Sequence, residues 1–232
     1  MPSALVVFSG GQDSTTCLYA AKKAHDEVTA LCFDYGQKHI IELESASRIA
    51  DMVECKLIKM PIPGVLSGTS PLIYHENQVH TYESADVLPG GLENTFVPAR
   101  NLLFLTIAAS VAYAIGADYL YTGVCQADFG GYPDCRQSFI DVAEKAINQA
   151  LFLPEDERHL SIETPLMNFT KAESVLFAKG LPGCFDALAY SHTCYQGVCP
   201  PCGKCHSCLL RSRGFGEAGI EDPLLTRLRG EL

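Results

Sequence analysis

A glycine turn between a short apolar run and a polar helix start limits the possible folds of this chain more than any other sequence feature. Residues 4–8 are continuous, apolar and rich in β-branched or aromatic side chains, as expected of a strand buried on both faces of a parallel sheet. Gly10 and Gly11 follow, and they lack the Cβ atoms that would keep an anion away from the backbone N–H groups. A helix is predicted to begin near Asp13, and its positive end favours phosphate. We therefore predict a phosphate-binding loop, with an unliganded glycine turn as the alternative.

The side chains after the glycines extend this prediction. Asp13, Ser14 and Thr15 are of the types that cap the first amides of a helix, and the lysine of a Walker loop is missing. The stretch Ser-Gly-Gly-Gln-Asp-Ser resembles the PP-loop of ATP pyrophosphatases, which cleave ATP between its α- and β-phosphates and place AMP on a carbonyl or carboxylate oxygen. This resemblance implies an ATP site made of Phe8, Ser9, Gly10, Gly11, Gln12, Asp13, Ser14 and Thr15.

Strand and helix patterns alternate beyond the loop. Strands are predicted over residues 28–33, 55–59, 119–123 and 162–164, and helices over 15–25, 40–54, 102–115, 138–153 and 171–179, the last with Thr170 as its cap. This order favours an α/β fold with an open, mostly parallel sheet and helices on both faces. We expect a nucleotide-binding domain over residues 1–190 and a small segment over 191–232. Residues 60–95, rich in proline and glycine, are predicted to be an insertion over the ligand site or against a partner subunit, or else a flexible loop.

Charge and hydropathy argue against several classes of function. The net charge of −10, from 17 Lys plus Arg against 27 Asp plus Glu, argues against a nucleic-acid partner and favours a small molecule. The most apolar segment, 102–115, is shorter than the ~20 residues that span a bilayer, so no membrane association is expected. The first apolar run is too short for a signal peptide, which predicts a cytoplasmic protein. In that compartment eleven cysteines favour metal binding or catalysis over disulfides.

Five cysteines gather near the end of the chain. Cys194, Cys202, Cys205 and Cys208 form a C-x7-C-x2-C-x2-C array whose short gaps let the sulfurs converge on one tetrahedral ion, so we predict structural Zn²⁺. With Cys199 in place of Cys194 the array approaches an iron–sulfur run, although the proline that follows the last cysteine of such runs is missing. Scattered buried thiols are the third alternative.

Polar and aromatic side chains follow the predicted strands. Tyr35 lies after one strand, and Arg100 lies at a helix start, where a cation is favoured only if an anion binds between it and the helix. A surface arginine paired with a nearby acid is the alternative. Residues 124–136 combine carboxylates, a guanidinium, thiols and aromatic rings, which suit a planar heterocycle with polar edges. An ordinary turn at Gly130-Gly131 is the alternative there.

Residues 8–18, 33–39, 94–101, 122–136, 164–166 and 193–208 together resemble the QueC family of 7-cyano-7-deazaguanine synthases. The resemblance spans nearly the whole chain, and the run Gly-Val-Cys-x-x-Asp-Phe-x-Gly-Tyr-Pro-Asp-Cys-Arg is its most specific part. It implies conversion of 7-carboxy-7-deazaguanine and ammonia to a nitrile through an amide, with two cleavages of ATP to AMP and pyrophosphate. It also implies one Zn²⁺ on the four cysteines and a homodimer. Mg²⁺ is expected with ATP because the charge of the leaving pyrophosphate must be neutralised.

The same resemblance suggests residue roles. We expect catalysis by Asp13, Ser14, Arg100 and Lys171, and binding of the deazaguanine by Tyr35, Gln37, Arg100, Asn101, Asp128, Tyr132, Asp134 and Arg136. A carboxylate, Asp128 or Asp134, would read the donor edge of the base, and a cation would hold its carboxylate. Three alternatives remain: a PP-loop enzyme that adenylates tRNA, a non-catalytic nucleotide or metal sensor, and a related enzyme with another acceptor.

Overall fold

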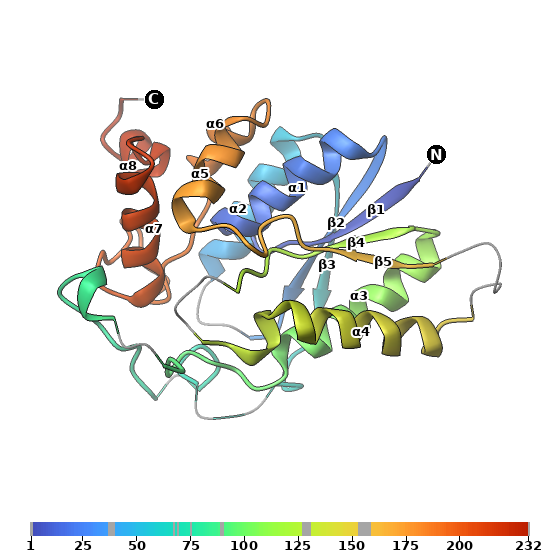
Figure 1. The fold of residues 1–232 in the computed structure, drawn as a ribbon. Helices are drawn as coiled ribbons and strands as arrows, with labels where there is room; N and C mark the ends of the chain where they lie inside the picture. The colour runs from blue at the N-terminus through green and yellow to red at the C-terminus, as the bar shows by residue number, and fades with distance from the viewer. Residues whose placement is uncertain are drawn as a thin grey trace.

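The structure is a computed structural model that describes residues 2–36, 40–66, 68, 70–74, 76–88, 91–126, 131–152 and 159–231. Its centre is a parallel five-stranded sheet in the order β3-β2-β1-β4-β5 (Figure 1). The strands are β1 (Ser3–Val7), β2 (Glu27–Asp34), β3 (Lys56–Pro61), β4 (Tyr119–Tyr121) and β5 (Ser161–Glu163). Every described strand pair in this sheet is parallel, which confirms the predicted sheet.

Helices cover both faces of the sheet (Figure 1). On one face lie α1 (Gln12–Ala24), α2 (Ile40–Met52), α5 (Lys171–Lys179) and α6 (Cys184–Leu188), and on the other lie α3 (Arg100–Ile115) and α4 (Gln137–Ala150). Alternate residues of β1 point to opposite faces, so Val6 enters one apolar core and Leu5 the other. Both side chains are fully buried.

The end of the chain is helical. Helix α7 (His206–Glu217) packs against α5, and α8 (Pro223–Leu228) packs against α6. Phe215 of α7 is buried in the same apolar cluster as α1 and α6. Arg211 fixes this arrangement, because its guanidinium is 5% exposed and binds both carboxylate oxygens of Asp222 at 2.6 and 2.8 Å. The tail therefore packs against the sheet domain through buried side chains.

The strand order places the glycine turn at a functional position. From β1 the chain proceeds to β2 and β3 on one side and then crosses back to β4 on the other side of β1. Connections on the two sides of such a strand diverge at its carboxyl end, which opens a crevice there. The turn after β1 lies at this point.

The segment between β3 and α3 holds little regular structure, apart from the short 3₁₀ helix η1 (Ala85–Val87) among its described residues. Leu66 and Leu72 pack with Val97, and Val79 packs against the cysteines of the tail. The predicted insertion thus contacts both the crevice side of the sheet and the tail. Among the described residues, no helix is both long and apolar enough to cross a bilayer.

Candidate active site

Close packing requires glycine in the turn after β1. Gly10 has a φ of +80°, and a Cβ atom at this position would lie 2.6 Å from the backbone nitrogen of Ala46 and 2.7 Å from the carbonyl oxygen of Glu42. Both atoms belong to α2, whose backbone cannot easily move away. The turn is therefore held directly against α2, and only glycine satisfies both the conformation and the space.

Hydroxyl groups hold the turn in shape. The amide of Ser9 donates to Ser14 Oγ at 3.2 Å, and Ser14 Oγ donates to the carbonyl of Gly11 at 3.3 Å. Thr15 Oγ1 donates to the same carbonyl at 2.7 Å. The prediction that these side chains cap the helix is wrong, because Gly11 is the N-cap of α1 and makes no side-chain capping bond. The hydroxyls brace the loop instead, and the positive end of α1 is left for a ligand.

Asp13 pairs with a lysine of another helix and not with the amides at the start of α1. Its Oδ2 lies 2.6 Å from Nζ of Lys171, and the two side chains are only 25% and 14% exposed. Oδ1 of Asp13 is buried and accepts no hydrogen bond from the described residues, and Nε2 of Gln12 is buried in the same way. The loop therefore offers one neutralised carboxylate together with polar atoms available to a ligand.

The sequence around Lys171 explains its placement. Thr170 accepts from the amide of Glu173, and the Glu173 carboxylate accepts from the amide of Thr170 at 2.8 Å, so α5 begins with a capping box. The predicted Thr170 cap is confirmed. Lys171, the first residue of α5, thereby points toward the loop.

A cavity of about 350 Å³ opens at the loop. It contacts the loop on one side, a group of aromatic side chains on another and the start of α7 on a third. Of the residues predicted for the site, those lining the cavity are Phe8, Ser9, Gly11, Gln12, Asp13, Ser14, Tyr35, Arg100, Asn101, Tyr132, Arg136 and Lys171. One enclosed space thus connects the candidate phosphate site to a candidate site for a flat molecule.

Arg100 lies in the aromatic part of the cavity. Burial opposes its charge, but the neighbouring tyrosines, Tyr35 first and then Tyr195 and Tyr132, raise the pKa of the guanidinium further above its usual value. Phe104 stacks on Phe33 at 4.3 Å between ring centroids and lies beside Tyr35. A permanent cation among aromatic rings suits a planar anion.

Asp134 has a partner within the protein. Its side chain is 7% exposed, its Oδ2 accepts from the backbone amide of Asn101 at 3.1 Å, and it is not among the described residues that line the cavity. Asn101 in turn donates through Nδ2 to the carbonyl oxygen of Asp134 at 3.0 Å. Ala99, the N-cap of α3, has no side chain that could accept this amide, so Asp134 supplies the cap from a distant loop. The anion expected at this helix start is therefore, at least in part, a residue of the protein.

The rest of the predicted base-binding loop is only partly described. The Tyr132 hydroxyl lies 2.7 Å from Thr95 Oγ1, and its ring lies against Phe96. Arg136 is exposed at the margin of the cavity. Gln37 and Asp128 lie outside the described residues.

The predicted site lacked several residues with polar side chains that line the cavity. Glu42 of α2, His192 and Tyr195 are three of them. In the sequence, Glu42 occupies an ordinary polar position of a helical pattern, so nothing marks it as a site residue. Burial raises the pKa of its carboxyl group to about 8. Arg100 opposes this shift and Cys194 adds to it. Tyr195 directly follows the first cysteine of the array, and this position could have marked it as a candidate site residue.

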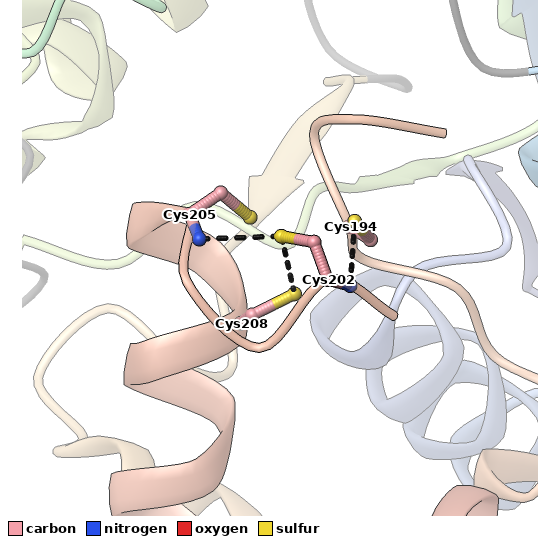
Figure 2. Close-up of side chains that lie close together, drawn as sticks. All are labelled: Cys194, Cys202, Cys205 and Cys208. Atoms are coloured by element: carbon pink, nitrogen blue, oxygen red, sulfur yellow. Dashed lines mark hydrogen bonds between the residues drawn. The ribbon is translucent and has the colours of Figure 1, made fainter. Parts of the chain in front are cut away.

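The cysteine array converges in space (Figure 2). One ligand atom from each of Cys194, Cys202, Cys205 and Cys208 lies within 4.8 Å of the others. Backbone amides support the sulfurs, since the amide of Cys205 donates to Cys202 Sγ at 3.3 Å and that of Cys202 donates to Cys194 Sγ at 3.4 Å. Neighbouring thiols and the Cys202 amide lower the pKa of the Cys194 thiol. Such a set of sulfurs fits a metal ion, whereas Cys199 is exposed and lies outside the group.

The array is joined to the loop and to the insertion. The amide of His192, two residues before Cys194, donates to the carbonyl of Gly10 at 3.0 Å. On its other side, Cys205 pairs with Thr81 in an antiparallel bridge, and the Tyr82 amide donates to the Lys204 carbonyl at 2.8 Å. A metal bound here would fix segments that form the wall of the cavity.

A glycine turn at the switch point of a parallel sheet, with a largely buried lysine at its edge, defines an α/β protein of the kind that binds ligands at the carboxyl ends of its strands. Comparison with known proteins agrees. The family model described as "Queuosine biosynthesis protein QueC" matches residues 3–219. The chain belongs to the QueC family.

Individual relatives match over nearly their full length. The chain is 48% identical to a protein of Gloeobacter violaceus named 7-cyano-7-deazaguanine synthase, over 97% of this chain and 96% of that one. It is 47% identical to a protein of the same name from Laribacter hongkongensis, over 98% and 96%. Among solved structures, NMN synthetase from Francisella tularensis aligns with a TM-score of 0.47 and 12% identity, covering 99% of this chain and 77% of that chain.

Proposed function

We propose that this chain is an ATP-dependent 7-cyano-7-deazaguanine synthase, the activity for which its relatives at 48% and 47% identity are named. The observation that carries the proposal is the single cavity that joins the glycine loop to an arginine surrounded by tyrosines. A substrate with a flat ring and a carboxylate could there present its carboxylate to a nucleotide bound at the loop. Adenylation of tRNA and a sensor function are not favoured, because neither belongs to the family that matches.

The reaction requires activation of an oxygen twice. In the first half, the substrate carboxylate attacks the α-phosphorus of ATP, pyrophosphate leaves, and ammonia then displaces AMP to give an amide. In the second half, the amide oxygen is adenylated in the same way, and loss of AMP and of the N–H protons gives the nitrile. The positive end of α1 and Lys171 would stabilise the charge that develops on the phosphates. Arg100 would hold the carboxylate in line.

The deazaguanine would occupy the aromatic part of the cavity. Tyr35 and Tyr132 would contact its ring, and Asn101 and Arg136 would contact its polar groups. The roles predicted for Gln37 and Asp128 in the same loops are kept as proposals from the sequence. The role predicted for Asp134 is kept in the same way, beside the bond by which its carboxylate caps α3.

Two metal ions fit the residues present. The free Oδ1 of Asp13 is the kind of buried oxygen that Mg²⁺ binds, and the ion would neutralise charge on ATP. The four cysteines would hold one Zn²⁺ with no open coordination position, so the role of this ion would be structural.

The experiment is a product assay with purified protein. Nitrile, AMP and pyrophosphate should form only when ATP, Mg²⁺, ammonia and 7-carboxy-7-deazaguanine are all present, as measured by mass spectrometry and a pyrophosphate assay. Pyrophosphate release that does not depend on the deazaguanine would contradict the proposal.

The same proposal includes the assembly and the location of the protein. Leu102 and Tyr113 of α3 are each 43% exposed and lie on the same side of the helix, where they could contact a second copy in the predicted homodimer. The cytoplasmic location and the division of the chain near residue 190 are kept from the sequence. Sedimentation of the purified protein would test the dimer.

A further inference from the structure

The cavity contains a carboxyl group that the chemistry described so far leaves without a role. Among the described residues that line it, only Asp13 and Glu42 carry carboxylates. Asp13 is neutralised by Lys171 at 2.6 Å. Glu42 makes no ion pair or side-chain hydrogen bond with another described residue. A second carboxylate is out of place in a cavity that must hold ATP and an anionic acid, unless it receives a cation.

The position of Glu42 brings it close to the reacting groups. Its own carbonyl oxygen would be 2.7 Å from a Cβ atom on Gly10, so it lies directly behind the phosphate loop. Arg100 is near enough to lower the pKa of the Glu42 carboxyl group, and Arg100 is the proposed partner of the reacting carboxylate. Glu42 therefore lines the cavity beside the glycine loop and within electrostatic range of Arg100.

The titratable groups around Glu42 come from several elements. Arg100 of α3 favours its ionised form, whereas Cys194 of the tail opposes it. Glu42 itself raises the pKa of the thiol of Cys32 in β2 and of the phenol of Tyr35 after β2. Tyrosine rings and a carboxylate together are suited to a small cation such as ammonium.

We propose that Glu42 is a catalytic residue that binds ammonium and takes its proton before attack on the adenylated carboxylate. This inference rests on the proposed function, in which ammonium is the one substrate that carries a positive charge. Before ammonium binds, burial keeps much of this carboxyl group protonated near neutral pH, and a bound ammonium ion would favour its ionised form as Arg100 does. The pKa values of base and ammonium then approach each other, which eases proton transfer between them.

The proposed step balances as follows. Ammonium gives one proton to the Glu42 carboxylate and becomes ammonia. The ammonia lone pair forms a C–N bond to the acyl carbon, the C–O bond to the phosphoryl group breaks, and AMP leaves with that electron pair. A second N–H proton passes to water, which leaves the neutral amide.

The test separates adenylation from attack by ammonia. Wild-type protein, Glu42→Gln and the control Glu44→Gln, an exposed position on the same helix, are compared in three assays. The first is exchange of labelled pyrophosphate into ATP with the acid present and ammonia absent. The second is amide and nitrile formation over a range of ammonium concentrations. The third is hydroxamate formation with hydroxylamine, which is largely uncharged at neutral pH and needs no base to become a nucleophile.

We expect Glu42→Gln to keep pyrophosphate exchange and hydroxamate formation within about threefold of wild type, while turnover with ammonium falls about 100-fold or more. The control should match wild type in all three assays. Loss of exchange in Glu42→Gln would overturn the inference, since it would make Glu42 a ligand of ATP, Mg²⁺ or the base. Equal losses with ammonium and hydroxylamine, or unchanged turnover with ammonium, would also overturn it.

A second variant keeps the test possible if Glu42→Gln does not fold. If Glu42→Gln is insoluble, Glu42→Asp keeps the charge and shortens the side chain, and it should lose more turnover with ammonium than exchange. Equal losses in the two assays would overturn the inference. Failure of the wild-type protein to form nitrile would instead contradict the proposed function, so the two outcomes are distinguishable.

Discussion

Nζ of Lys171 lies 2.6 Å from Oδ2 of Asp13, across 158 residues of sequence, and this pair closes one side of the phosphate loop. The lysine neutralises the loop carboxylate and adds a cation beside the positive end of α1. The loop lacks the lysine of a Walker loop, and a lysine of another helix lies beside it.

Lys171→Met should lower pyrophosphate release about 100-fold or more, because Asp13 would then face the phosphates without a countercharge. The measurement is acid-dependent pyrophosphate exchange at saturating ATP. Lys23→Met, at an exposed position of α1, is the matched control and should be unaffected. Near-normal exchange in Lys171→Met would show that the pair is structural only.

Gly10→Ala should destabilise the protein more than Gly36→Ala does. Both glycines have positive φ, +80° and +78°, but only at Gly10 would the new Cβ meet backbone atoms, whereas nothing lies within 4 Å at Gly36. The strain of the left-handed conformation costs ~1–2 kcal/mol in each case, and overpacking at Gly10 should add ~1–3 kcal/mol. Urea unfolding of the two variants measures the difference, and equal losses would contradict the packing argument.

Much of the fold could be predicted from local patterns. The β1–turn–α1 unit, the Thr170 cap and the converging cysteines depend on residues close in sequence, and the sequence analysis located them correctly. Contacts between distant segments could not be predicted in this way. The bond from Asn101 to Asp134 and the position of Glu42 behind Gly10 arise only when helices and loops are packed together.

Asp134→Ala should reduce stability by ~1 kcal/mol, because it removes the cap from the start of α3. Asp134→Asn keeps an acceptor oxygen and should lose less. Thermal unfolding of both variants is the measurement. A rise in KM for the deazaguanine with no loss of stability would instead show that Asp134 acts mainly in substrate binding.

Cys199→Ser should retain one metal ion per chain, whereas Cys202→Ser should lose it, because only Cys202 belongs to the group of converging sulfurs. Elemental analysis of the two purified variants gives the stoichiometry. A brown wild-type protein with visible absorption, or loss of metal in Cys199→Ser, would favour the iron–sulfur alternative.

Glu42 should make stability depend on pH. Its carboxyl group titrates at about 8 in the folded chain against 4.5 as the reference value, so between these values the folded state holds a proton that the unfolded state has released. Stability is therefore lost as pH rises through this window. The melting temperature of Glu42→Gln relative to wild type should be higher at pH 8 than at pH 5, and Glu44→Gln should show no such trend. A constant difference would contradict the raised pKa.

The separation of Asp13 from Lys171 also has a consequence during synthesis. A ribosome that adds ~5–20 residues per second needs roughly 8–30 s to proceed from the loop to the lysine. Through that interval the nascent chain contains the nucleotide loop but not the cation that completes it. The two side chains of this pair can therefore meet only after the second half of the polypeptide has been made.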